Sequence, residues 1–384
     1  MICDFCQQDL GDPVYKPVKT LRHMAVFECP ECRLCQSRSL QAFERDTTRT
    51  LSCDSDWGNV RHGKGARFSA VLAWLDDIDF SSMQEILDVG SNRGDFVLWA
   101  NQKHPHLKIT ALEPDSSILS NYENKSNINI INSRFEDVAT AKFDFIYSVH
   151  TLEHASSARG MLEKKRTLLN PGGKLLLEVP NLAAIGDPDN VEEFFIDKHT
   201  FHFSRSVLLN MVKALGFTIL RGDSDCDIYN ITLLLTPDEE ARLDDEKSGE
   251  KAESYLHQIM QYELTMKKNR QFLKRLVSDK LAPLAERQQV GFWGAGRIFN
   301  ALVKYGGLKP EHVHCLVDRH LWQIIDNNEG IPIDKPEALK QSEPQVLVIL
   351  GRSSAEAMRK EAHAMGIRHV VSFTDLMAQV ALSD

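Results

Sequence analysis

The segment from Ile86 to Phe96, ILDVGSNRGDF, constrains the fold more than any other stretch of the chain. An apolar strand ends at the acidic Asp88, a glycine-bearing turn follows, and a helix starts after Gly94. Such a strand places its carboxylate at the carboxyl edge of a parallel sheet, where α/β folds bind ligands, and Gly90 and Gly94 let the backbone approach a ligand closely. The segment therefore predicts a nucleoside-binding corner.

The spacing of the two glycines distinguishes between possible cofactors. Glu113, 23 residues after Gly90, ends the next predicted strand and can accept both ribose hydroxyls of either a dinucleotide or an adenosine. The turn follows GxxxG and not GxGxxG, so it lacks the tight turn that a pyrophosphate requires. The corner therefore favours a non-phosphorylated adenosine cofactor, S-adenosylmethionine.

The chain divides into four parts by pattern. Its 384 residues exceed what one core usually supports, so several compact units are expected. From about Arg67 to Thr236, apolar strands alternate with amphipathic helical intervals, which is typical of a parallel sheet covered by helices. The predicted parts are a cysteine-rich module at 1–60, an α/β core at 61–236, a helical connector at 237–287 and a smaller Rossmann-like α/β domain at 288–384.

The cysteine-rich module has the ligand spacing of a metal site. Because disulfides do not persist in the cytosol, five cysteines within the first 35 residues indicate a metal. Cys35 offers an alternative partner, and Cys53 or His23 could substitute, but two symmetric CxxC knuckles need no special geometry. Four thiolates leave no open coordination position, so we expect a structural zinc in a zinc-ribbon-like module. The expected ligands are Cys3, Cys6, Cys29 and Cys32.

Five segments of the core, in order, resemble class I S-adenosylmethionine-dependent methyltransferases: LDVGSNRGDF, ALEPD, FEDV, FDFIYSVHTLEHA and LLNPGGKLLLEVPN. The resemblance implies a Rossmann-like methyltransferase sheet in which Glu113 holds the ribose. It also implies that the segment from Ser148 to His154 faces the methionine part of the cofactor, and that Phe135 and Glu136 lie near the adenine. The residues that it places at the cofactor are Asp88, Gly90, Ser91, Asn92, Gly94, Glu113, Phe135, Glu136 and His150.

The carboxy-terminal part contains a second strand, glycine turn and helix in VGFWGAGRIFNALV, followed by Asp318 in LVDRH. Gly294 and Gly296 give GxG, but Phe299 replaces the last glycine of GxGxxG. An oxidoreductase with a nicotinamide cofactor at this turn is therefore an alternative that the incomplete fingerprint disfavours. A scaffold unit without a ligand is another.

The order of the four parts resembles the nucleotide-sugar C-methyltransferases, which methylate a ring carbon of a deoxythymidine-diphosphate keto sugar. That family carries a motif HEHxxYFS with a catalytic histidine, and this chain has DKHTFHFS at residues 197–204. The resemblance makes His199 the expected base, because a neutral imidazole has a suitable pKa of about 6.5 for removing an acidic C–H proton. Lys198 replaces the glutamate; it would either place a positive charge near an enolate or a diphosphate, or be a solvated surface residue of a loop. His202 replaces the tyrosine and would relay a proton or pack.

Departures from the family pattern leave the acceptor open. Tyrosines expected before the core are absent from TLSCDSDWGNVRHGKGARF, where Arg61 and Lys64 could instead bind a phosphate or carboxylate. If the acceptor is a hydroxyl, the same base supports O-methylation of another small molecule or glycan. A third alternative is an inactive scaffold or binding protein, against which the intact Asp88 and Glu113 argue.

Composition excludes two classes of partner. A net charge of −9 provides no general attraction for nucleic acid, and no apolar run approaches the roughly 20 residues of a membrane span. The first residues lack the basic start and apolar stretch of a secretory signal, so a cytoplasmic location is expected. The expected partner is a small-molecule substrate.

Overall fold

The chain forms two compact units in the computed structural model. The first holds the described residues of Met1–Ser55, Gly65–Asp187 and Glu193–Gln261, and the second those of Pro188–Glu192 and Tyr262–Asp384. The structure describes residues 1–17, 23–40, 66–115, 126–138, 141–188, 190–222, 227–238, 252–323, 325–351 and 354–381.

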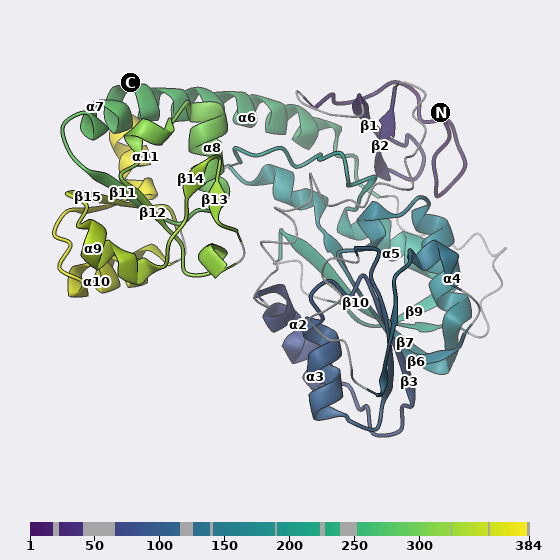
Figure 1. The fold of residues 1–384 in the computed structure, drawn as a ribbon. Helices are drawn as coiled ribbons and strands as arrows, with labels where there is room; N and C mark the ends of the chain where they lie inside the picture. The colour runs from purple at the N-terminus through teal and green to yellow at the C-terminus, as the bar shows by residue number, and fades with distance from the viewer. Residues whose placement is uncertain are drawn as a thin grey trace. The chain divides into compact units, whose positions relative to one another are not determined.

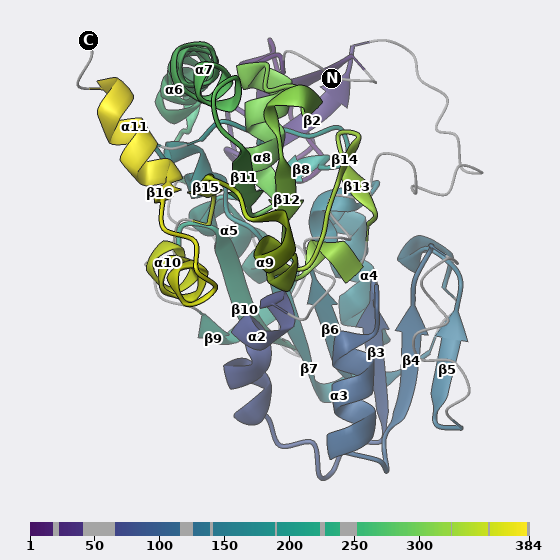
Figure 2. The ribbon, with the colours of Figure 1, turned by 60° about the vertical axis from the view of Figure 1, so that its left-hand side comes forward.

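The first unit is built on a seven-stranded sheet with the order β5-β4-β3-β6-β7-β10-β9. The neighbouring strands β5, β4, β3, β6 and β7 are parallel, whereas β10 runs antiparallel to both of its neighbours, β7 and β9. Figure 2 shows β3, β4 and β5 side by side at one edge. The alternation of apolar strands and helical intervals predicted from about Arg67 to Thr236 is confirmed. The strands are β3 (Glu85–Val89), β4 (Lys108–Leu112), β5 (Ile128–Ile131), β6 (Phe143–Val149), β7 (Leu169–Pro180), β9 (Phe217–Gly222) and β10 (Asn230–Pro237).

Side chains alternate between the two faces of this sheet, as period-two strands require. Ile86 of β3 packs with helices α2 (Ala66–Asp76) and α3 (Asp95–Lys103), whereas the next residue, Leu87, packs on the opposite face. That face is covered by two further helices (Figure 1). These are α4 (Ala158–Leu168) and α5 (Arg205–Ala214). The result is the three-layer α/β core that the pattern predicts.

Short helical turns follow three of the strands and contribute to the site described below. They are η2 (Phe135–Asp137), η3 (Leu152–His154) and η4 (Leu182–Gly186). Of these, η3 begins three residues after β6, at the carboxyl edge of the sheet.

The amino-terminal module takes one strand from the core. Strands β1 (Met24–Glu28) and β2 (Cys35–Ser39) form an antiparallel hairpin, and β8 (Phe201–His202) pairs with β2 as the third strand. The buried Glu28 carboxylate joins the hairpin to the residues just before helix α6 (Leu256–Leu276), because it accepts hydrogen bonds from Ser254 Oγ at 2.7 Å and Tyr255 N at 2.6 Å. The module also contacts α4, because Arg159 N donates to Asp4 Oδ2 at 2.9 Å. Several separate contacts therefore tie it to the rest of the first unit.

The second unit contains a parallel sheet with the order β12-β11-β15-β16, which confirms the second α/β domain. Helices α8 and α11 pack on one face, and α9 and α10 on the other. The strands are β11 (Val290–Trp293), β12 (Cys315–Val317), β13 (Asn327–Asn328), β14 (Ile331–Pro332), β15 (Val346–Ile349) and β16 (Val370–Ser372). The helices and turns are α7 (Ala282–Ala285), α8 (Arg297–Ala301), α9 (Leu339–Ser342), α10 (Ala355–Ala364), α11 (Phe373–Ala381), η5 (Val277–Leu281), η6 (Leu302–Gly306), η7 (Pro310–His312), η8 (Leu321–Gln323) and η9 (Pro336–Ala338).

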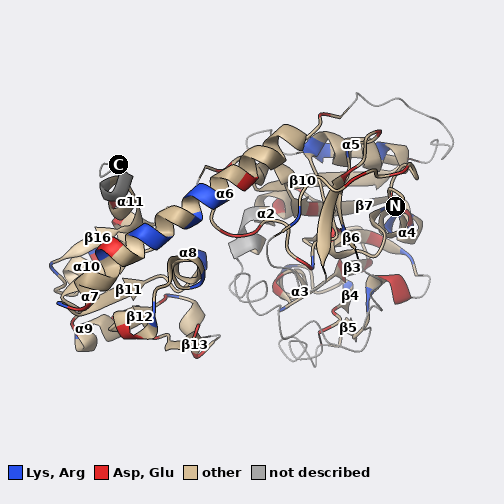
Figure 3. Ribbon diagram, turned by 90° about the horizontal axis from the view of Figure 1, so that it is seen from above, with Lys and Arg blue, Asp and Glu red and all other residues tan. Residues whose placement is uncertain are grey.

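Helix α6 (Leu256–Leu276) begins in the first unit and ends in the second. Some of its apolar side chains are buried, among them Ile259, Met266 and Leu273, whereas Leu256, Met260 and Leu264 are exposed. Its second half is rich in Lys and Arg (Figure 3). Lys274 and Arg275 lie in the last turn, where positive charge stabilises the helix dipole. None of the described helices is both long enough and apolar enough to span a membrane.

Candidate active site

Asp88 is buried at the carboxyl edge of the sheet, where it is the penultimate residue of β3. Burial, together with the carboxylates of Glu113 and Asp95, raises the pKa of Asp88 well above its ordinary value. Its Oδ1 has no hydrogen-bond partner among the described residues. A buried carboxyl oxygen in this position fits a ligand that donates a hydrogen bond to it.

At Gly90, the turn after β3 leaves no room for a side chain. Gly90 has φ +77°, and a Cβ added there would lie 2.9 Å from Thr151 Oγ1, which itself donates to Val89 O at 2.8 Å. Gly94 has φ +82° and precedes the first turn of α3. Both residues lie in the left-handed region, so the turn exposes backbone where a cofactor would lie.

Glu113 lies beside this turn with acceptor capacity left over. Its Oε2 accepts from Asn92 N at 2.8 Å and its Oε1 accepts from Asp115 N at 2.9 Å. A carboxylate oxygen can accept more than one hydrogen bond, so both oxygens can also accept from ribose hydroxyls. Together with Asp88 and the glycine turn, this arrangement fits the adenosine part of S-adenosylmethionine.

Phe135 and Glu136, predicted near the adenine, lie on η2. Phe135 is buried, with Lys164 Nζ 5.4 Å and Lys165 Nζ 5.5 Å from its ring centroid. Glu136 Oε1 accepts from both the backbone N and the Oγ of Ser156. Their contact with adenine stays a prediction.

His150 follows β6 directly and lies between two buried carboxylates. Its Nδ1 is 3.3 Å from Glu153 Oε1, and its Nε2 is 3.2 Å from Glu178 Oε1. Glu178 is held in turn, because its Oε2 accepts from Thr232 Oγ1 at 2.8 Å. His150 also adopts φ +51°, an uncommon value for a non-glycine residue that marks a tightly determined position.

His199 lies in a cluster with two residues of η3. The rings of His154 and His199 have centroids 4.8 Å apart and are nearly perpendicular. One possible ligand atom from each of Glu153, His154 and His199 lies within 4.8 Å of the others. Burial, followed by the neighbouring His154, lowers the pKa of His199 well below its ordinary value, while Glu153 acts in the opposite direction. The imidazole of His199 is therefore neutral at pH 7.

Lys198 and His202, the other predicted catalytic residues, contact different neighbours. The backbone oxygen of Lys198 accepts from His154 Nδ1 at 3.1 Å. His202 is buried, and its Nε2 is hydrogen-bonded to Ser37 Oγ of β2 at 2.8 Å. This contact gives His202 a role in joining β8 to β2, and its catalytic role stays a prediction.

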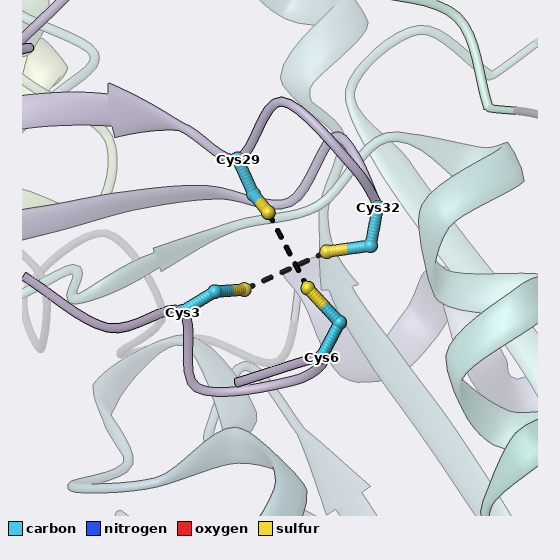
Figure 4. Close-up of side chains that lie close together, drawn as sticks. All are labelled: Cys3, Cys6, Cys29 and Cys32. Carbon is cyan, nitrogen blue, oxygen red and sulfur yellow. Dashed lines mark hydrogen bonds between the residues drawn. The ribbon is translucent and has the colours of Figure 1, made fainter. Parts of the chain in front are cut away.

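The four predicted zinc ligands come together in one cluster (Figure 4). The sulfur atoms of Cys3 and Cys32 are 3.5 Å apart, and those of Cys6 and Cys29 are 3.4 Å apart. These separations are close to the roughly 3.8 Å expected between thiolates around a tetrahedral zinc with bonds of about 2.3 Å. The Cys32 thiol and the Gln36 amide are hydrogen-bonded to Cys3 Sγ, and the pKa of Cys3 is lowered to about 5. The donor set is therefore compatible with zinc.

Cys35, the alternative ligand, is buried outside this cluster. Burial, with the nearby charge of Glu28, raises the pKa of the Cys35 thiol well above its ordinary value. A thiol in that state is a poor metal ligand.

In the second unit, the carboxylate of Asp318, which follows β12, is hydrogen-bonded to the backbone of the turn after β11 and to its own loop. Asp318 Oδ2 accepts from Ala295 N at 3.0 Å, and its Oδ1 accepts from His320 N and Leu321 N. Phe299, in place of the third glycine, is completely buried. The Asp318 carboxylate therefore stabilises the turn after β11.

Two acidic residues of the site were not singled out from the sequence. Glu153 lies within the matched segment SVHTLEH, and Glu178 interrupts the apolar strand GKLLLEVP. An acidic residue inside a buried strand needs a partner, and that signal could have identified Glu178. Arg61 and Lys64 lie outside the described residues.

Comparison with protein families gives two matches. Residues 61–221 match a family described as a methyltransferase domain, and residues 238–373 match one described as a C-methyltransferase C-terminal domain. Comparison with the curated proteins gives no match.

Solved structures that are similar to part of the chain share little sequence with it. A Mesorhizobium loti S-adenosylmethionine-dependent methyltransferase is 15% identical with a TM-score of 0.38, covering 45% of this chain and 98% of its own. An S-adenosylmethionine-dependent methyltransferase from Clostridium acetobutylicum is 12% identical with a TM-score of 0.37, and the similarity covers 48% of this chain and 92% of that one. The N-terminal domain of EvdMO1, with S-adenosylhomocysteine bound, is 15% identical with a TM-score of 0.35, covering 44% and 80%.

The methyltransferase match includes the corner at Asp88, the ribose-binding candidate Glu113 and the segment after β6. It thus confirms the methyltransferase interpretation, and the nicotinamide oxidoreductase alternative has no support from these comparisons. The chain is an S-adenosylmethionine-dependent methyltransferase with a C-methyltransferase C-terminal domain.

Proposed function

We propose that the enzyme transfers the methyl group of S-adenosylmethionine to a carbon atom next to the ketone of a nucleotide-linked sugar. The observation that carries this proposal is the half-buried position of His199, whose ring lies beside that of His154 on η3, the turn that follows β6. The lowered pKa of His199, caused first by burial, agrees with a role as a base. The segment that contains η3 is the one expected to face the methionine part of the cofactor. The match of residues 238–373 to a C-methyltransferase C-terminal domain favours carbon over oxygen as the methylated atom.

The proposed reaction needs one base and one aligned methyl donor. His199 removes the acidic proton beside the ketone, and the electron pair of that C–H bond forms the enolate. The enolate carbon then attacks the sulfonium methyl in line, so that a C–C bond forms as the C–S bond breaks and S-adenosylhomocysteine leaves. Lys198 is proposed to stabilise the enolate or a diphosphate by its positive charge, and His202 to relay the proton.

Asp88, Glu113 and the glycine turn are proposed to hold the cofactor. Asp88 Oδ1, which has no hydrogen-bond partner in the described part of the chain, and the remaining acceptor capacity of Glu113 support this assignment. The methyl donor supplies an electrophilic carbon when bound, and the side chains on this edge of the sheet align it.

The four cysteines are proposed to bind one structural zinc ion. The crossed sulfur pairs at 3.4 and 3.5 Å support this, because four thiolates fill a tetrahedral shell and leave no position for a substrate. Metal analysis of the purified protein should give one zinc per chain, and a value well below one would contradict the proposal.

The acceptor is tested by thermal protection followed by product analysis. A panel of thymidine-diphosphate keto sugars, their reduced analogues and unrelated hydroxylated sugars is screened for stabilisation in the presence of S-adenosylhomocysteine. Sugars that protect are then incubated with S-adenosylmethionine, and nuclear magnetic resonance locates the new methyl group. Methylation of an oxygen, or of a sugar without a nucleotide, would overturn the corresponding part of the proposal.

The role of His199 is tested by substitution. His199→Ala should abolish turnover and leave the affinity for S-adenosylhomocysteine within about two-fold, since the base acts on the acceptor. His257→Ala, at an exposed position on α6, is the matched control and should retain full activity. Retention of activity in His199→Ala would refute its assignment as the base.

A further inference from the structure

Glu153 is a buried carboxylate that faces three imidazoles. It is 1% exposed, and neither of its oxygens meets the geometry of a hydrogen bond within the part of the chain that the structure describes. Its Oε1 lies 3.3 Å from His150 Nδ1 and 3.7 Å from His154 Nε2. An isolated buried carboxylate is costly, so these histidines must account for its ionised state.

His150 lies between two buried carboxylates, with Nδ1 on the side of Glu153 and Nε2 on the side of Glu178. The buried amine of Lys165 also lies within the electrostatic reach of Glu153. Of the two carboxylates, Glu153 is the one that also lies beside His154 and His199. Its negative charge is therefore the one placed next to the His199 ring.

The backbone holds His199 at this carboxylate. Thr200 N donates to Glu153 O at 2.8 Å, which ties the residue after His199 to η3. The Nδ1 of His154 is hydrogen-bonded to Lys198 O at 3.1 Å, which turns its Nε2 toward Glu153. The relative positions of the three side chains are thus determined by hydrogen bonds on both sides of His199.

We propose that Glu153 is a positioning residue that stabilises the positive charge His199 acquires when it removes the proton from the acceptor. This inference rests on the proposed function, in which His199 is the base. His150 acts behind it: against the effect of burial, its ring lowers the pKa of Glu153 and so helps to keep that carboxylate ionised. The base therefore becomes an imidazolium beside a preorganised negative charge, which lowers the barrier of the proton-transfer step.

The groups that face His199 determine the sign of the expected pH effect. Glu153 and His154 face it from η3, His150 from the end of β6, and His202 from β8. Among these, Glu153 alone raises the pKa of His199. Replacing its carboxylate by an amide should therefore lower that pKa further and make His199 a weaker base.

The test compares Glu153→Gln with Glu153→Asp. In Glu153→Gln, kcat should fall about 100-fold, KM for S-adenosylmethionine should change less than about three-fold, and the acid limb of the kcat profile should move to lower pH. Glu153→Asp keeps the negative charge, so its kcat should be at least about ten-fold higher than that of Glu153→Gln. Glu163→Gln, which removes an exposed carboxylate paired with Arg159 on α4, is the matched control and should leave the profile unchanged.

Two outcomes would overturn the inference. A lower kcat in Glu153→Gln with an unmoved acid limb would assign Glu153 a structural role only. A second metal ion per chain that is lost in Glu153→Gln would show instead that Glu153, His154 and His199 are metal ligands.

Nuclear magnetic resonance titration of labelled histidines separates this inference from the proposed function, because it requires no acceptor. The His199 resonance should titrate at lower pH in Glu153→Gln than in the wild type, even if no tested sugar is methylated. Should the variant fail to fold by circular dichroism, Glu153→Asp carries the test. An unchanged His199 titration in a folded Glu153→Gln would also refute the inference.

Discussion

Single residues in the cofactor corner are constrained by the backbone as much as by their chemistry. Gly90 combines a positive φ with a close approach to Thr151 Oγ1, so both conformation and space exclude a side chain there. Gly172 has a similar φ of +73° but nothing within 4 Å of an added Cβ. Comparing Gly90 with Gly172 therefore separates the effect of a positive φ from the effect of a steric clash.

Gly90→Ala should weaken S-adenosylhomocysteine binding at least about ten-fold, because Thr151 or the turn must move to admit the methyl group. Gly172→Ala should lose a similar stability of about 1 kcal/mol from backbone strain and keep its cofactor affinity. Calorimetric titration and urea unfolding measure the two quantities. Equal affinity in both variants would contradict the role of the turn.

Lys165 is a fully buried lysine on α4 whose Nζ donates to Ser148 Oγ at 2.7 Å. Burial lowers the pKa of Lys165 to about 7, against the opposing charges of Glu153 and Glu136. The unfolded chain therefore binds a proton between about pH 7 and pH 10.5 that the folded chain does not. The penalty for burying Lys165 is full below pH 7 and is relieved as the pH rises.

Lys165→Met should therefore stabilise the protein at pH 7 by up to a few kcal/mol, and the gain should shrink at about 1.4 kcal/mol per pH unit above that. Urea unfolding at pH 7, 8.5 and 10 measures the difference from the wild type. Lys164→Met is the control: its ammonium donates to the carbonyl oxygens of Glu136 and Val138, so its loss should destabilise. A pH-independent effect of Lys165→Met would show that the buried amine is not the cause.

The residues of the corner could be predicted from sequence because their spacing reflects local backbone geometry. Asp88, Gly90, Gly94 and Glu113 each end a strand or make a turn, and such features appear as short patterns. Glu153 and His199 are 46 residues apart, and no periodicity shows that they share one cluster. Contacts between distant segments depend on packing, which a single sequence does not display.

At the level of elements, the pairing of β8 with β2 connects the cysteine cluster to the proposed base. Ser37 N donates to Thr200 O at 2.8 Å, and the neighbouring Gln36 donates to Cys3 Sγ at 3.3 Å. A strand of two residues is too short for any sequence pattern to predict. Its role is positional, because it fixes the segment that carries His199.

Removal of the proposed zinc ion should therefore impair catalysis more than cofactor binding. Chelation under reducing conditions should lower kcat at least about ten-fold, while the affinity for S-adenosylhomocysteine changes less than about three-fold. Cys6→Ala should reproduce this loss of metal and activity. Cys35→Ala removes a thiol outside the cluster and should keep one metal per chain; loss of metal in that variant would contradict the ligand assignment.

At the scale of the whole molecule, each unit has its own cores. Among the residues that the structure describes, the core clusters of the methyltransferase sheet contain no residue of the second unit, and those of the carboxy-terminal sheet contain none of the first. The corner that would bind the cofactor lies entirely in the first unit. A ligand that binds one folded unit stabilises that unit by mass action.

Differential scanning calorimetry should accordingly resolve two unfolding transitions, of which S-adenosylhomocysteine shifts only one. At about 100 times its dissociation constant the ligand adds about 2.7 kcal/mol, which corresponds to an upward shift of roughly 5–10 °C for a unit of this size. Gly90→Arg is the control, since it fills the corner and should abolish the shift while leaving the second transition in place. A single transition that moves as a whole would show that the two units unfold cooperatively, and that separate cores do not make them energetically independent.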